Sequence, residues 1–103
     1  MKRAEVYSMI SDERRRQAKK WGANHGWGEG DCSSPLVDAP VKVAVLSEEV
    51  GEVARAVLER DSQALARELT QVAAVAVAWL ESLEIEPLPL AKLFEQEVHY
   101  DTP

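Results

Sequence analysis

Residues 38–83 read DAPVKVAVLSEEVGEVARAVLERDSQALARELTQVAAVAVAWLESL, and this stretch decides the fold. Its apolar residues recur at the spacing of an amphipathic helix on both sides of a short polar break at Asp61. Pro40 suits the first turn of a helix, so we expect one helix over 38–60. Asp61 is typical of an N-cap, and a second helix is expected over 62–83. Because the connection is so short, the two helices should form a long antiparallel hairpin.

The rest of the chain is expected to form helices and a loop, without strands. Residues 3–21 carry apolar side chains near helical spacing, either as one helix or as two pieces divided near Ser11. Residues 22–39 contain four glycines and a proline, which predicts a long loop. Residues 88–99 are expected to form a short C-terminal helix. The predicted fold class is therefore all-α, a helical bundle in a single domain over 1–103.

The composition excludes several classes of protein. The 103 residues include 12 Lys+Arg and 18 Asp+Glu, and the net charge of -6 argues against a general nucleic-acid binder. The single cysteine, Cys32, cannot form an internal disulfide, which fits a reducing, cytoplasmic location. The longest apolar run, 72–80, covers nine residues, about half of what spans a bilayer, so no membrane partner is expected.

Two acidic residues of the helix predicted over 38–60 lie on apolar faces. At about 100° per residue, one apolar arc of this helix consists of Val43, Leu46, Val50, Val53 and Val57. Glu49 lies about 40° from the edge of this arc. Glu52 falls between Val41 and Val45 in a second apolar sector. Only Glu48 points where solvent is expected.

The helix predicted over 62–83 repeats this pattern. Glu68 shares its face with Val72 and Val75. Gln71 lies about 60° from Glu68 around the helix axis and, with Glu49, Glu52 and Glu68, makes a set of four polar side chains. Since 72–80 is apolar on every side, this helix should be almost wholly covered. Acidic residues are therefore predicted on faces that should be buried.

The register of the hairpin brings the four polar side chains to similar heights. Glu52 lies nine residues before Asp61, and Glu68 lies seven residues after it. Glu49 lies twelve residues before it, and Gln71 lies ten residues after it. At about 1.5 Å per residue, each pair is within roughly 3 Å of the same height.

Three carboxylates in an apolar setting cannot all stay ionised without compensation, because desolvating each charge costs several kcal/mol. Either some become protonated, or a cation lies among them. Oxygen ligands without His or Cys favour a hard ion, so the predicted cofactor is Mg²⁺ or Mn²⁺. The alternative is a solvated acidic face supported by Arg55 and Lys42.

These residues resemble the MazG-type, all-α nucleoside triphosphate pyrophosphohydrolases, whose signature is EExxE on one helix and ExxD on the next. Here 48–52 reads EEVGE and, after fifteen residues, 68–71 reads ELTQ. The flanking text at 45–54, VLSEEVGEVA, and the loop entry at 20–25, KWGANH, are also similar to the family. The resemblance covers roughly residues 10–83.

The resemblance implies hydrolysis between the α- and β-phosphates of a nucleotide substrate, which releases a monophosphate and pyrophosphate. It implies that Glu49, Glu52 and Glu68 hold Mg²⁺, with Gln71 where the family has Asp. It also implies that Glu48 orients or deprotonates the attacking water. Metal-neutralised phosphate oxygens and an in-line water are what this reaction requires.

The family is oligomeric, so the resemblance also implies a homodimer or a homotetramer, a dimer of dimers. A chain of 103 residues with one helix apolar all round fits this expectation, because a partner subunit would cover what one chain cannot.

Gln71 departs from the family pattern. Its carbonyl oxygen can bind Mg²⁺, but it brings no charge, so metal affinity should fall or a second ion should be lost. One alternative is therefore a nucleotide-binding or regulatory homologue that has lost catalysis. A second alternative is a structural helical assembly module whose glutamates lie at the surface.

The glycine-rich loop supplies the candidate substrate-binding residues. Trp21 and His25, with Trp27 nearby, are expected to stack on a base and to hydrogen-bond its edge. Lys20, like Arg16, is a candidate contact for the triphosphate. The alternatives are that Trp21 closes the core and that the histidine and the basic residues lie in water.

Overall fold

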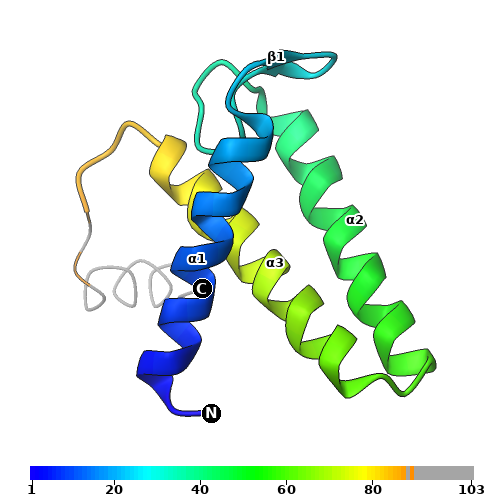
Figure 1. The fold of residues 1–103 in the computed structure, drawn as a ribbon. Helices are drawn as coiled ribbons and strands as arrows, with labels where there is room; N and C mark the ends of the chain where they lie inside the picture. Colours follow the sequence, from blue (N-terminus) through cyan, green and yellow to red (C-terminus); the bar gives the residue numbers. More distant parts are fainter. Residues whose placement is uncertain (88, 90–103) are drawn as a thin grey trace, which may run out of the picture.

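The structure, a computed structural model, describes residues 1–87 and 89 and consists mainly of three helices (Figure 1). In chain order the elements are α1 (Arg3–Trp21), β1 (Asn24–His25), β2 (Gly28–Glu29), α2 (Ala39–Leu58) and α3 (Ser62–Ser82). The prediction of a mostly helical fold is confirmed. The C-terminal helix predicted over 88–99 falls, apart from residue 89, outside the described part of the chain.

α1 is one uninterrupted helix, so the alternative of two pieces divided near Ser11 does not apply. Glu5 caps its first turn, since Oε1 of this side chain accepts a hydrogen bond of 3.0 Å from the backbone N–H of Lys2. The helix ends at Trp21 and is capped by Gly22, where a Cβ atom would lie 2.5 Å from the carbonyl oxygen of Ala18. A side chain at this position would force the backbone to shift, so glycine is needed there.

The segment between α1 and α2 contains a two-stranded antiparallel sheet, so the prediction of a loop without strands is wrong here. Asn24 pairs with Glu29, and His25 pairs with Gly28. Gly28 and Gly30 have φ angles of 145° and 93°, a backbone region that other residues rarely adopt. Each strand has only two residues, which is too short for an alternating pattern to be visible in the sequence.

α2 and α3 lie side by side and run in opposite directions (Figure 1). Both begin at an aspartate whose side chain accepts a hydrogen bond from the backbone three residues later, at 3.3 Å for Asp38 and 3.0 Å for Asp61. Arg60, with a φ of 54°, adopts the left-handed conformation that often ends a helix. The two helices therefore begin and end within two residues of the predicted bounds, 38–60 and 62–83.

α3 contacts both α1 and α2 and carries most of the core. Within residues 1–87 and 89, the buried apolar residues are Val37, Ala56, Ala74, Val75 and Ala78. The small side chains among them allow neighbouring helices to approach closely. The expectation that α3 is almost wholly covered is wrong at its edges, because Leu69 is 50% exposed and Leu80 is 68% exposed.

The apolar arc of α2 is also only partly covered in the single chain. Val43, Val50 and Val57 recur every seven residues on this arc, and each is half exposed. Among residues 1–87 and 89, no helix has the length and apolar character needed to cross a membrane.

An ion-pair network, mostly buried at Arg14 and Asp31 and half exposed at Glu81, joins α1, the loop and α3. Nε of Arg14 donates to Glu81 at 2.9 Å, and Nη1 donates to Asp31 in the loop at 3.0 Å. Burial by itself would raise the pKa of Asp31, but hydrogen bonds from Ser33 and Arg14 outweigh it and lower this pKa. The network therefore fixes the loop to the helices most firmly when Asp31 is ionised.

Lys42 makes a second buried connection between the loop and the helices. Its side chain packs against the loop between α1 and α2, and the residue is only 4% exposed. Its Nζ donates to the carbonyl oxygen of Ser34 at 3.0 Å and to Oγ of Ser82 at 2.8 Å. The alternative in which Lys42 supports a solvated acidic face is therefore wrong, because this ammonium group faces the loop and the end of α3.

Candidate functional site

Three of the predicted site residues converge between α2 and α3. The end of the Gln71 side chain lies between the carboxylates of Glu49 and Glu68. With its amide nitrogen turned toward them, it donates to Oε2 of Glu49 at 2.8 Å and to Oε2 of Glu68 at 2.6 Å. We call Glu49, Glu68 and Gln71 the carboxylate–amide cluster.

The orientation of the Gln71 amide depends on what lies inside this cluster. With the nitrogen inward, its two N–H groups donate to the two carboxylates and reduce their repulsion. With the oxygen inward, acceptor oxygens of three side chains face one another, which is favourable only if a cation or a carboxyl proton lies between them. The metal-free protein therefore takes the first orientation, and a cation bound by all three side chains requires the second.

The electrostatics of the cluster centre on Glu49. Burial raises the pKa of Glu49, and the negative charges of Glu68, Glu48 and Glu52 raise it further. The carboxylate of Glu13, on α1, acts in the same direction. A cation at this point would lower the pKa of Glu49 and so offset the effect of these charges, so the cluster favours a positive ligand.

The other two predicted glutamates lie at the margin of the cluster. Oε2 of Glu52 lies 3.6 Å from Nη1 of Arg55, and the Glu52 side chain is 44% exposed. Glu48 is exposed on α2. Within the described residues, no three His, Cys, Asp or Glu side chains form a group that could hold a metal ion. The oxygen donors that the structure does bring together are those of two carboxylates and one amide.

Glu13 is a charged residue near the cluster that the sequence analysis missed. It is buried on α1, and both of its carboxylate oxygens accept hydrogen bonds from Nε of Arg16, at 2.6 and 2.7 Å. A signal was available, because Val6, Ile10 and Glu13 are spaced i, i+4 and i+7 and so share a helix face. An acidic residue in line with apolar ones on α1 repeats the pattern of α2 and α3.

The loop and the end of α1 form an aromatic cluster of Trp21, His25 and Trp27. The ring centroid of Trp21 lies 5.4 Å from that of His25 and 6.4 Å from that of Trp27, and both ring pairs are edge to face. Nζ of Lys20 lies 5.1 Å from the centroid of the Trp21 ring. Trp27 is 64% exposed, so its ring is the one most open to a ligand.

Both ring nitrogens of His25 are used inside the loop. Nε2 lies 2.6 Å from the carbonyl oxygen of Gly30 and donates to it. Nδ1 then accepts a hydrogen bond of 3.2 Å from the backbone N–H of Trp27. His25 therefore holds the loop in shape, and the ring faces of the tryptophans are left as the surface for stacking.

The two clusters lie at different levels of the bundle. The aromatic cluster is at the end where α1 finishes and α2 begins (Figure 1). Glu49 lies ten residues after Ala39, the first residue of α2, or about 15 Å along the helix. The two clusters are therefore separated along the length of the bundle.

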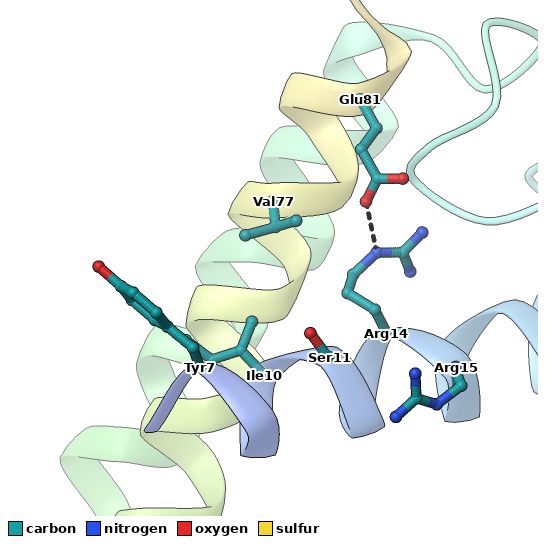
Figure 2. A pocket seen from close by; sticks show the side chains of 7 residues that line it. All are labelled: Tyr7, Ile10, Ser11, Arg14, Arg15, Val77 and Glu81. Carbon is teal, nitrogen blue, oxygen red and sulfur yellow. Dashed lines mark hydrogen bonds and ion pairs between the residues drawn. The ribbon is translucent and has the colours of Figure 1, made fainter. Parts of the chain in front are cut away.

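The structure also has an open cavity on the other side of α1, away from both clusters. It has a volume of about 420 Å³ and is lined by Tyr7, Ile10, Ser11, Arg14, Arg15, Val77 and Glu81. Figure 2 shows that the Arg14–Glu81 ion pair crosses one side of it, while Tyr7 points away from α3. None of its lining residues belongs to the predicted site, so its shape does not bear on that prediction.

Two features of the described residues bring predicted site residues together, the carboxylate–amide cluster and the aromatic cluster. The chain matches no protein-family model, no curated protein and no solved structure. A functional proposal depends on the chemistry of these two clusters.

Proposed function

We propose that the protein is a Mg²⁺-dependent nucleoside triphosphate pyrophosphohydrolase of the MazG type, which converts (d)NTP to (d)NMP and pyrophosphate. The observation that carries this proposal is the convergence of Gln71 with the carboxylates of Glu49 and Glu68, at 2.8 and 2.6 Å. Hard divalent ions prefer such oxygen ligands, and a cation relieves the repulsion that raises the pKa of Glu49. The residues present therefore fit Mg²⁺, with Mn²⁺ as an alternative.

Each residue of the site has a distinct task in this proposal. Glu49, Glu68 and Oε1 of Gln71 would hold Mg²⁺, with Glu52 one turn away on α2 as a further ligand. The bound ion would neutralise the charge on the phosphate oxygens. Glu48, exposed beside Glu49, would orient the attacking water or accept its proton.

The aromatic cluster would bind the nucleoside end of the substrate. The exposed ring of Trp27 and the edge-to-face ring of Trp21 offer a surface for stacking, which contributes about 1–3 kcal/mol per base. Lys20 lies beside Trp21 and would meet the phosphate chain. A free thiol at Cys32 is compatible with a reducing cytoplasm, where nucleotide pools are found.

The first test is the reaction itself. We expect the protein, incubated with a panel of (d)NTPs and Mg²⁺, to release pyrophosphate and the matching monophosphate, and we expect EDTA to stop the release. Anion-exchange chromatography separates pyrophosphate from single phosphate and so identifies the bond that is cleaved. Release that is equal with and without metal, or release of single phosphate alone, would contradict the proposal.

A second candidate function is a nucleotide-binding homologue without catalysis. The observation in its favour is that the Gln71 amide can satisfy Glu49 and Glu68 through its own N–H groups, so the cluster is stable without metal. A structural assembly module is the third alternative, and it predicts that Mg²⁺ leaves the melting temperature unchanged. A metal site requires the opposite, because a ligand that binds only the folded state stabilises it.

We also propose that the chain forms a homodimer or homotetramer through the half-exposed arc of α2. We expect wild-type protein to sediment as an oligomer, and Val50→Glu to raise the dissociation constant by at least about tenfold, because a carboxylate would be buried without a partner. Leu36→Glu, at a loop position that is 65% exposed, is the control and should leave the dissociation constant of the oligomer unchanged. Wild-type protein that sediments as a monomer at micromolar concentration would overturn this proposal.

A further inference from the structure

We infer that Arg16, held in place by the buried carboxylate of Glu13, binds the phosphate chain of the substrate; this inference rests on the proposed function. In this arrangement Arg16 contacts the substrate, and Glu13 is a positioning residue that acts through it.

The geometry of the pair fixes the direction of the guanidinium group. Nε of Arg16 donates to both oxygens of Glu13, at 2.6 and 2.7 Å, and Nη2 lies 2.6 Å from Oε1. The Glu13 side chain is only 8% exposed, while the Arg16 side chain is 54% exposed. One edge of the guanidinium is therefore anchored in the protein, and its other N–H donors face solvent.

The pair lies between the two clusters of the candidate site. The charge of Glu49 acts on the Arg16 guanidinium, and the charge of Glu13 acts on Glu49, so both residues lie within the range of direct charge interaction with the carboxylate–amide cluster. Lys20 follows Arg16 by four residues and so lies on the same face of α1, beside Trp21. Two cations of α1 thus line the way from the carboxylate–amide cluster to the aromatic cluster.

A second pair on α1 shows what is unusual about Arg16. Arg15 and Asp12 have the same i, i+3 spacing, but both side chains are mostly exposed, at 74% and 67%. Such a surface pair holds its arginine only weakly. The buried partner of Arg16 instead pre-orients a planar fork of donors, which is the geometry that binds phosphate oxygens in pairs.

The experiment uses inorganic tripolyphosphate with Mg²⁺ as the probe, because it carries the phosphate chain without a base. Calorimetry of Arg16→Ala should show binding weakened by about tenfold or more relative to wild type, with KM for a (d)NTP raised similarly and kcat changed less. Glu13→Gln should raise KM in the same direction by a smaller factor. Arg15→Ala and Asp12→Asn are the matched controls and should stay within about twofold of wild type.

The outcomes separate this inference from the proposed function. Wild-type protein that hydrolyses (d)NTP while Arg16→Ala binds tripolyphosphate as well as Arg15→Ala does would overturn the inference alone. Wild-type protein that binds tripolyphosphate through Arg16 without hydrolysing (d)NTP would overturn the proposed function alone. Absence of tripolyphosphate binding by wild-type protein also overturns the inference. If Arg16→Ala does not fold, Arg16→Lys keeps the charge without the fork, and an affinity equal to that of wild type contradicts the inference.

Discussion

Glu49→Gln is expected to abolish nearly all Mg²⁺-dependent pyrophosphate release, by about 100-fold or more, while making the metal-free protein more stable. The loss of activity follows because the variant removes one of the two carboxylates that meet at Gln71. The gain in stability follows because it also removes a charge that burial and neighbouring carboxylates disfavour. Opposite effects on activity and stability are typical of a residue kept for binding a ligand.

The pH dependence of stability gives this prediction a second signature. The pKa of Glu49 in the folded protein is raised above its ordinary value of 4.5. The folded state therefore binds more protons than the unfolded state between these two pKa values, and the free energy of unfolding falls as the pH rises through them. As the pH rises between these two pKa values, the free energy of unfolding of the metal-free wild-type protein should fall, and that of Glu49→Gln should not show this fall.

Chemical denaturation at several pH values in EDTA, together with pyrophosphate release in Mg²⁺, checks both parts. Glu59→Gln is the matched control, because Glu59 is an exposed glutamate at the C-terminal end of α2. Its Oε1 lies 3.6 Å from Nε of Arg55. It should change neither activity nor the pH dependence appreciably. If Glu49→Gln retained wild-type activity, the carboxylate–amide cluster would not be the metal site.

Gln71→Asp is expected to raise the affinity for Mg²⁺ by about tenfold or more and to destabilise the metal-free protein. The aspartate adds a negative charge beside Glu49 and Glu68 and removes the amide group, whose nitrogen, when turned toward them, lies 2.8 and 2.6 Å from their oxygens. Three carboxylates at this point need protonation or a bound cation to compensate their charges, and Mg²⁺ supplies the cation. The stabilisation by Mg²⁺ should therefore be larger in the variant than in wild type.

The same variant distinguishes the first two candidate functions. A wild-type enzyme with measurable activity that rises modestly in Gln71→Asp supports the pyrophosphohydrolase. A silent wild-type protein that gains activity in the variant supports the homologue without catalysis. Melting temperatures with and without Mg²⁺ give the metal affinity, and Gln63→Asp, an exposed position on the first turn of α3, is the control. An unchanged response to Mg²⁺ in Gln71→Asp would count against a metal at this cluster.

The sequence predicted the features of this protein that depend on neighbouring residues. The aspartate caps at Asp38 and Asp61 act within one turn, so the bounds of α2 and α3 followed from them. The fixed rise of a helix placed Glu49 and Gln71 at similar heights, and the structure brings these two side chains within hydrogen-bond distance. Similar height alone did not place Glu52, which lies at the margin of the cluster beside Arg55.

The tertiary structure decided what depends on segments far apart in the chain. The approach of α1 places Glu13 near Glu49, and the ion pair between Arg14 and Glu81 joins residues 67 positions apart. Lys42 is buried because its ammonium group meets Ser82, 40 positions later, under a loop whose path local periodicity does not determine. Periodicity shows which side chains share a helix face, but the packing of all three helices decides which neighbour that face meets.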